Sequence, residues 1–175
     1  MKKIILLISI IAGINAKAQT YQANLLKNIT QNLYTNEYIK YQNKIYFSAN
    51  NASASIQNNE LWGTDGTSAG TVMVKDLSSS TNGSSPQSFV IMNNILYFLA
   101  NDGNGFELYK TDGTSAGTVM VKNINPGSPS SIISPPYLYN NALYFYADDN
   151  VNGIELWKSD GTSAGTVMVN DINPG

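Results

Sequence analysis

The chain has 175 residues, 42% of them apolar, which is enough for one domain with a sizeable core. It contains no Cys, no His and no Arg, and the net charge is −2. Disulfides, thiolate or imidazole metal sites, Ser-His-Asp triads and His or Cys nucleophiles are therefore excluded. The missing Arg and the acidic balance also argue against nucleic acid as a partner.

Residues 1–18 have the pattern of a secretory signal peptide. A lysine pair is followed by an apolar stretch, and Ala16 and Ala18 are the small residues of a cleavage site. The apolar stretch is too short to anchor the chain across a bilayer. We expect a mature chain from Gln19 with 7 Lys and 12 acidic residues, hence a charge of −5, and no membrane span. The sequence thus predicts a secreted protein, extracellular or at the cell surface.

The segment 19–33 is predicted to hold one isolated strand. Its residues Leu26 to Ile29 resemble the end of the fourth strand in the repeats that follow, Val121 to Ile124. A lone fourth strand would thus precede three complete units.

A ten-residue string, Asp-Gly-Thr-Ser-Ala-Gly-Thr-Val-Met-Val, occurs three times, starting at Asp65, Asp112 and Asp160. The spacings are 112 − 65 = 47 and 160 − 112 = 48 residues, and each copy follows a Glu-Leu-aromatic triplet. A fixed period of this length is typical of repeat architectures. We expect three repeats, at about 34–84, 85–132 and 133–175.

Each repeat is predicted to contain four short strands rich in β-branched and aromatic residues. In the second repeat they are Gln87–Met92, Ile95–Ala100, Phe106–Lys110 and Thr118–Lys122, and Tyr137–Tyr139 is the first strand of the third repeat. The expected fold is all-β, with tandem four-stranded antiparallel blades in a partial, open β-propeller-like array. The chain stops where another unit would start, and propellers usually have about 4–8 blades. We therefore expect a longer array, truncated at its C-terminus.

The aspartates that open the repeated string, Asp65, Asp112 and Asp160, have two interpretations. They could be catalytic or metal-binding carboxylates. The favoured interpretation is a structural turn between the third and fourth strands, because Asp readily bonds backbone N–H groups two or three residues on. A catalytic residue would seldom recur once per repeat.

The segment between the second and third strands varies in length and is the best place to look for function. It holds oxygen-rich clusters that could bind calcium, with Asp102, Asn104, Asp148, Asp149 and Asn152 as candidate ligands. Neither cluster has the EF-hand spacing. Solvated turns are the favoured interpretation, so we expect no cofactor, with calcium as the alternative.

Two further side chains recur once per repeat, a Glu and, two residues later, an aromatic. The pairs are Glu60 with Trp62, Glu107 with Tyr109, and Glu155 with Trp157. The aromatics could stack on sugars and the carboxylates could hydrolyse glycosidic bonds. Packing between blades, and a structural bond to a neighbouring turn, are the favoured alternatives.

The string Glu-Leu-Trp-x-x-Asp-Gly-Thr, complete in the first and third repeats and with Tyr109 for Trp in the second, resembles the ELWxxDGT repeat family. The resemblance covers nearly all of the mature chain. It implies an exported bacterial repeat scaffold, often part of a large surface or secreted protein, whose activity is largely unassigned.

The function expected from the sequence is a non-enzymatic scaffold for binding or adhesion, whose partner is an extracellular protein or a carbohydrate. One alternative is a fragment of an exported glycan-active enzyme with its catalytic part outside this chain. Another is a structural spacer in a large surface protein. Because the end units leave strand edges and faces uncovered, self-association through the open ends is also expected.

Overall fold

The computed structural model describes residues 38–50, 58–78, 83–127, 130–132 and 134–172. The predicted signal peptide (1–18) and the predicted lone strand in 19–33 lie outside this part of the chain. The described residues form strands, turns and bends without a helix. Accordingly, they include no helix long and apolar enough to cross a membrane.

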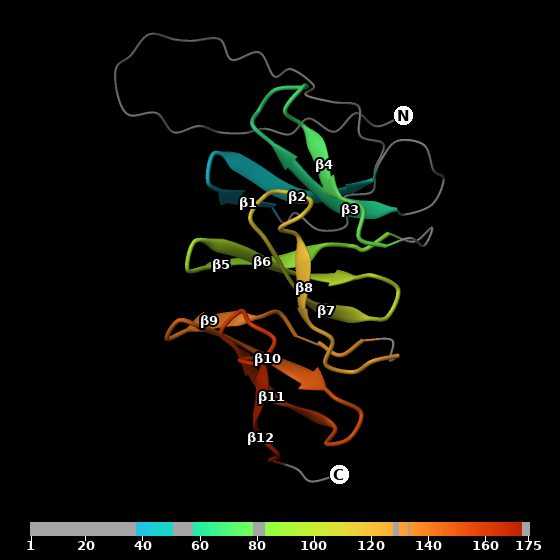
Figure 1. The fold of residues 1–175 in the computed structure, drawn as a ribbon, viewed down its shortest axis with the longest axis vertical. Helices are drawn as coiled ribbons and strands as arrows, with labels where there is room; N and C mark the ends of the chain where they lie inside the picture. Colours follow the sequence, from blue (N-terminus) through green and yellow to red (C-terminus); the bar gives the residue numbers. More distant parts are fainter. Residues whose placement is uncertain (1–37, 51–57, 79–82, 128–129, 133, 173–175) are drawn as a thin grey trace.

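Twelve strands form three separate four-stranded antiparallel sheets, each built from consecutive strands. This confirms the predicted all-β, open array of four-stranded units (Figure 1). The first sheet contains β1 (Tyr38–Tyr41), β2 (Lys44–Asn50), β3 (Asn59–Thr64) and β4 (Val72–Lys75). The second contains β5 (Gln87–Met92), β6 (Ile95–Asn101), β7 (Phe106–Thr111) and β8 (Val119–Lys122). The third contains β9 (Tyr137–Tyr139), β10 (Ala142–Asp148), β11 (Ile154–Ser159) and β12 (Val167–Asn170).

Asparagine pairs form the first hairpin of the second and third sheets. Asn93 and Asn94 have φ of 52° and 56°, and Asn140 and Asn141 have φ of 45° and 61°. Two positive φ values in a two-residue turn match the right-handed twist of the flanking strands, and Asn tolerates them. The tight Asn-Asn turn therefore sets the register in which Met92 faces Ile95.

The three sheets are stacked along the molecule, and their first strands contact one another, β1 with β5 and β5 with β9. We call the side of a sheet that faces the following sheet its front face, and the opposite side its back face. In the third sheet, the front face is the side that carries the same repeat positions. In the first interface the front residues Tyr46 and Leu61 pack against the back residues Leu96 and Phe98. In the second interface the front residues Tyr97, Leu99, Leu108 and Val121 pack against Leu143, Phe145, Ala147 and Trp157.

A buried serine links each sheet to the next through backbone bonds. The amide of Ser84 donates to the carbonyl of Asn59 at the start of β3, and its own carbonyl accepts from the amide of Asn101 at the end of β6. Ser131 accepts from the amide of Asp148 in the same way. These bonds tie the segment between two sheets to both of them.

Three predicted strand boundaries differ from the observed ones by one residue: β6 ends at Asn101 instead of Ala100, β7 ends at Thr111 instead of Lys110, and β8 does not include Thr118. Thr118 was expected to begin the fourth strand, but β8 begins at Val119. The hydroxyl of Thr118 pairs with that of Thr111 and donates to the carbonyl of Thr114, so Thr118 belongs to the hairpin instead.

Candidate functional site

The repeated aspartates lie in the hairpins between the third and fourth strands, where each organises its own turn. In the second sheet, Oδ1 of Asp112 accepts hydrogen bonds from the amide and the hydroxyl of Thr114, at 2.8 and 2.7 Å. The same hydroxyl accepts from the amide of Gly117, at 2.9 Å. A Cβ on Gly117 would lie 2.1 Å from Oδ1 of Asp112, so the turn requires glycine there.

Asp65 and Asp160 make the same bonds with Thr67 and Thr162. The Thr hydroxyl and the Thr amide lower the pKa of all three aspartates. An aspartate held in this way is ionised at neutral pH and is poorly suited to act as a general acid. The same geometry in all three hairpins gives these side chains a role within the turn.

The two acidic loops, which join β6 to β7 and β10 to β11, are also closed by their own carboxylates. Oδ1 of Asp102 accepts from the amide and the side-chain nitrogen of Asn104, both at 3.1 Å. Oδ1 of Asp148 accepts from the amide of Asn150 at 2.7 Å. Asp149 accepts from the amide of Asn152 at 2.8 Å.

Slight burial opposes ionisation of Asp149, but the bonds from Asn152 and Val151 outweigh it and lower its pKa. Within the described part of the chain, no three His, Cys, Asp or Glu side chains gather into a group able to hold a metal ion. The calcium candidates named above thus make ordinary turn bonds in the absence of an ion.

All three glutamates of the Glu-Leu-aromatic triplets are buried, Glu155 at 4% exposure, and Glu60 and Glu107 bind the segment that leads to the next sheet. Glu60 accepts from the amides of Leu77 and Ser84, both at 3.0 Å, and from the hydroxyl of Ser84. Glu107 accepts from the amide of Ile124 and from the hydroxyl of Ser131. The bond that the sequence suggested is thus made to the connecting segment rather than to a neighbouring turn.

Burial raises the pKa of Glu60, and it raises that of Glu107 to about 7 against the opposing effect of bonds from Ser131 and Ile124. A carboxyl with such a pKa could donate a proton in catalysis. Glu107, however, has none of its surface exposed, so a substrate could not reach it without opening the interface.

The repeated aromatics are core residues. Trp62 and Trp157 are each 7% exposed and Tyr109 is 3% exposed, which leaves no open ring face for a sugar. Tyr109 stacks on Phe98, with ring centroids 5.8 Å apart. Nζ of Lys122, on the second sheet, lies 5.6 Å from the ring centroid of Trp157 in the third, an attractive cation–π distance.

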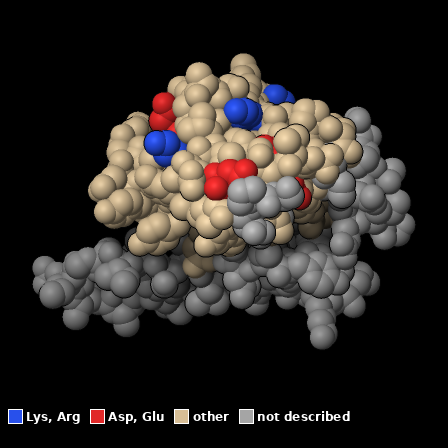
Figure 2. All heavy atoms as spheres, turned by 90° about the horizontal axis from the view of Figure 1, so that it is seen from below, with Lys and Arg blue, Asp and Glu red and all other residues tan. Residues whose placement is uncertain are grey.

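The sequence predicts that the end units leave faces uncovered, and one such surface among the described residues is the front face of the third sheet. It exposes three tyrosines: Tyr137 on β9 at 71%, Tyr139 on β9 at 57% and Tyr146 on β10 at 54%. Figure 2 views the molecule from this end, and its described surface is largely uncharged, with separate patches of Lys and of Asp or Glu. The repeat period could have located this face, since it consists of the positions that are buried in the second sheet.

The loops between the second and third strands of the second and third sheets lie at one edge of the array, to the right in Figure 1. The corresponding loop of the first repeat falls largely in 51–57, outside the described residues. The described loops place Asn, Asp and Gly at the surface, together with Val151, which is 80% exposed. This edge and the front face of the third sheet are therefore candidate surfaces for a partner.

No protein-family model matches this chain, and no curated protein matches it. Among solved structures, the chain is similar to a novel alpha-L-arabinofuranosidase from Clostridium thermocellum, at 13% sequence identity. The alignment covers 75% of this chain and 70% of that one, with a TM-score of 0.30. A likeness of this size carries no inference about activity.

Proposed function

We propose that this chain is an exported, non-enzymatic repeat scaffold that binds an extracellular protein or carbohydrate. Its binding edge is formed by the loops between the second and third strands. The observation that supports this most is that the repeated polar residues are used inside the fold. The aspartates close their hairpins, and Glu60 and Glu107 hold the connecting segments.

The loop edge suits binding because its sequence varies between repeats more than the third and fourth strands and their hairpins do. The β6–β7 loop contains Asp102-Gly103-Asn104, and the β10–β11 loop contains Asp149-Asn150-Val151-Asn152. Rigid sheets that present variable loops are a common arrangement for recognition. The resemblance to exported ELWxxDGT repeat proteins supports the same role, as does the predicted signal peptide.

A depletion assay tests this proposal. The secreted chain is incubated with insoluble cellulose, chitin, xylan and mannan, and separately with intact bacterial cells. The protein that remains in solution is then measured. We expect depletion by at least one of these surfaces, and loss of that depletion when residues 149–153 are replaced by Asn-Gly.

A matched control replaces Ser163 by Gln, which changes an exposed residue in the hairpin of the same sheet and leaves the loops intact. Release of reducing sugar from any of the polysaccharides would favour the glycan-active enzyme instead. Absence of binding to every surface would favour the spacer.

A further inference from the structure

The front face of the third sheet consists of the same repeat positions that bury the second sheet against the third. Leu108 and Ile124 in the second repeat are 1% and 7% exposed. Their counterparts in the third repeat, Leu156 and Ile172, are half-buried and 69% exposed. The third sheet therefore presents one side of an interface that the molecule has already built twice.

A tyrosine pair on this face is arranged like the tyrosine pair of the first sheet that packs against the second sheet. In the first sheet, the rings of Tyr41 and Tyr46 are 5.8 Å apart between centroids, and the hydroxyl of Tyr41 donates to the carbonyl of Asn94 at 2.9 Å. In the third sheet, Tyr139 and Tyr144 occupy the same positions, with centroids 6.2 Å apart. The second pair is thus in place without a following sheet.

In both existing interfaces a tyrosine hydroxyl sits against the first glycine of the following hairpin. A Cβ on Gly113 would lie 2.3 Å from the hydroxyl oxygen of Tyr46, and a Cβ on Gly161 would lie 2.0 Å from that of Tyr97. Tyr144 is the third member of this series. Its expected partner is another glycine at the same place in a hairpin.

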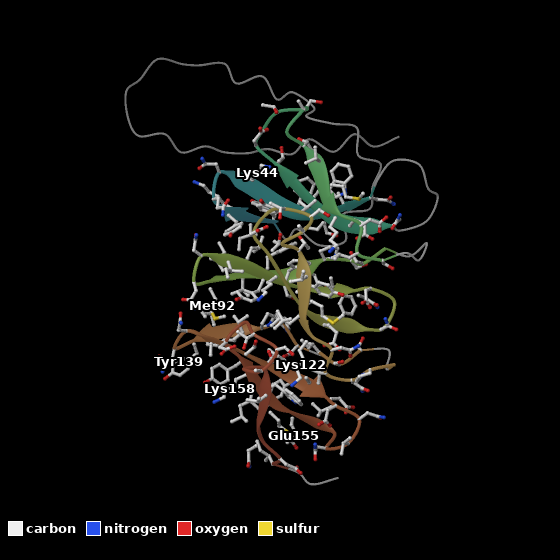
Figure 3. All side chains as sticks on the ribbon, in the orientation of Figure 1. Lys44, Met92, Lys122, Tyr139, Glu155 and Lys158 are labelled. Carbon is white, nitrogen blue, oxygen red and sulfur yellow. The ribbon has the colours of Figure 1, made fainter. Side chains whose placement is uncertain are left out.

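A lysine adds a polar contact to the second interface. Nζ of Lys110 donates to the carbonyl oxygen of Gly161 at 2.9 Å. Lys158, one repeat later, is exposed on the front face of the third sheet. Figure 3 shows Lys158 and Tyr139 on the third sheet, whereas Met92 lies between the second and third sheets.

The matching hairpin exists at the other end of the same molecule. Gly66 opens the hairpin of the first sheet with φ of +92°, and a Cβ there would meet nothing within 4 Å. Next to it on the back face, Ile45 and Phe47 are half-buried, whereas their counterparts Leu96 and Phe98 are fully buried. The first sheet has the hairpin glycine against which a front-face tyrosine packs in the other two sheets, and no tyrosine of the described residues lies against it.

We propose that two copies of this chain associate head to tail, with the front face of the third sheet in one copy packed against the hairpin and back face of the first sheet in the other. Tyr144 would lie against Gly66 of the other copy, and Lys158 would donate to the Gly66 carbonyl. Each copy would contribute one front face and one hairpin, so a dimer would contain two such contacts. Its six sheets would then form one ring, and propellers usually have about 4–8 blades.

One sequence difference between the repeats should make the contact between copies weaker than the contacts between sheets within one chain. Lys75 and Lys122 each donate from Nζ to a threonine carbonyl in the following sheet, at 2.7 Å. The corresponding position of the third sheet is Asn170, whose shorter side chain ends in an amide. The contact between copies therefore lacks one charge-assisted bond, and the dimer should dissociate on dilution.

Sedimentation of the full secreted chain over a wide concentration range tests the proposal. We expect a reversible dimer. The double variant Tyr139→Glu/Lys158→Glu alters only exposed residues of the front face, and it should be monomeric. The variant Gly66→Asn fills the space at the hairpin with a residue that tolerates positive φ, and it should also be monomeric.

Mixing the two variants decides the geometry. The front-face variant keeps an intact first-sheet hairpin and the Gly66→Asn variant keeps an intact front face, so the mixture should form a dimer through one contact. A wild-type chain that stays monomeric would overturn the proposal, as would a dimer that Gly66→Asn does not weaken. Melting curves by circular dichroism verify that each variant remains folded.

Discussion

The second and third sheets are built from nearly the same sequence, yet their front faces have opposite exposures. Met92 and Leu99 in the second sheet are 2% and 4% exposed, whereas Tyr139 and Tyr146 at the same positions in the third are 57% and 54% exposed. Their hairpins, in contrast, are closed by the same bonds at Asp112 and Asp160. The hairpin is thus a local structure that each repeat completes alone, whereas burial of the front face depends on the next sheet.

The exposed positions also carry more polar side chains. Tyrosine stands where the second sheet has Met92 and Leu99, and its hydroxyl can remain hydrated or find a partner. Tyr41 in the first sheet shows the second outcome, because its hydroxyl bonds the carbonyl of Asn94 in the sheet that covers it. The front face of the third sheet can therefore remain hydrated, and it can also pack against a sheet of the same repeat type.

The largest effect should come from truncating one leucine in each of these two sheets. Leu108→Ala leaves a cavity in the core between the second and third sheets and should lower the free energy of unfolding by about 2–5 kcal/mol. Leu156→Ala removes the same atoms from a half-buried site and should cost about 1 kcal/mol. Urea unfolding, at a concentration where the chain is monomeric, measures both. Equal losses would contradict the difference drawn between the two sheets.

A smaller effect should come from pH, through the carboxyl that anchors the segment between the second and third sheets. Burial raises the pKa of Glu107 to about 7 in the folded protein, above the ordinary value of 4.5. The folded state therefore binds the proton more tightly than the unfolded state does. The stabilisation is complete below pH 4.5 and is lost as the pH rises through 7, by at most roughly 3 kcal/mol.

Glu107→Gln keeps the shape of the side chain and should remove most of this dependence. Glu60, whose pKa is also raised, chiefly by burial, adds a dependence of the same sign that remains in the variant. Unfolding free energies measured from pH 4.5 to pH 7.5 test this. A wild-type protein that grows more stable across this range would contradict the raised pKa.

The next largest effect should be the difference in unfolding free energy between alanine substitutions at two hairpin glycines. Gly161 and Gly66 have φ of +90° and +92°, so alanine introduces the same backbone strain at both. Only at Gly161 does the new Cβ also meet a hydroxyl, that of Tyr97. Gly161→Ala should therefore lower the unfolding free energy by about 1–3 kcal/mol more than Gly66→Ala in the monomer. Replacing Tyr97 by Phe should reduce the additional loss, and the part that remains comes from the ring carbon, which would lie 2.8 Å from the new Cβ.

Lys110, at the interface between the second and third sheets, should contribute less to the unfolding free energy than these glycines do. Lys110→Met removes the bond from Nζ to the carbonyl of Gly161 but keeps most of the apolar stem, so a loss of about 1 kcal/mol is expected. Lys158→Met, at the equivalent exposed position, should change the unfolding free energy of the monomer by less than about 0.5 kcal/mol. A larger loss at Lys158 than at Lys110 would mean that the exposed lysine has a partner within its own chain.

The period of the sequence predicts most of this fold because each repeat encodes its own strands and turns. The predicted bounds Gln87–Met92 and Tyr137–Tyr139 agree with β5 and β9. Thr118 was placed in a strand because it is β-branched, but its hydroxyl bonds Thr114 across the hairpin. A local bond here overrides the β-propensity of the residue.

The sequence predicts the loop edge and the uncovered end faces, but the exposure of an individual side chain depends on whether a sheet packs against it. The residues around Leu156 closely resemble those around Leu108, and the two leucines differ in exposure because a described sheet packs in front of Leu108 and none of the described sheets packs in front of Leu156. The partner of Glu107 was also beyond sequence reasoning, since Ser131 lies in a connecting segment without strand periodicity. Contacts between segments 24 residues apart require the three-dimensional arrangement.

The smallest effect is expected for calcium at the loop edge of the same two sheets. Asp102 and Asp149 already accept hydrogen bonds from the amides of Asn104 and Asn152, so an ion would have to compete with existing turn bonds. Calcium sites usually supply six to eight oxygen ligands, a number that short loops with one or two carboxylates do not reach. Titration calorimetry should therefore detect no tight binding, and calcium should leave the melting temperature unchanged. A micromolar site lost in Asp102→Ala or Asp149→Ala would show that these loops rearrange around the ion, and that the turns described above are only their ion-free form.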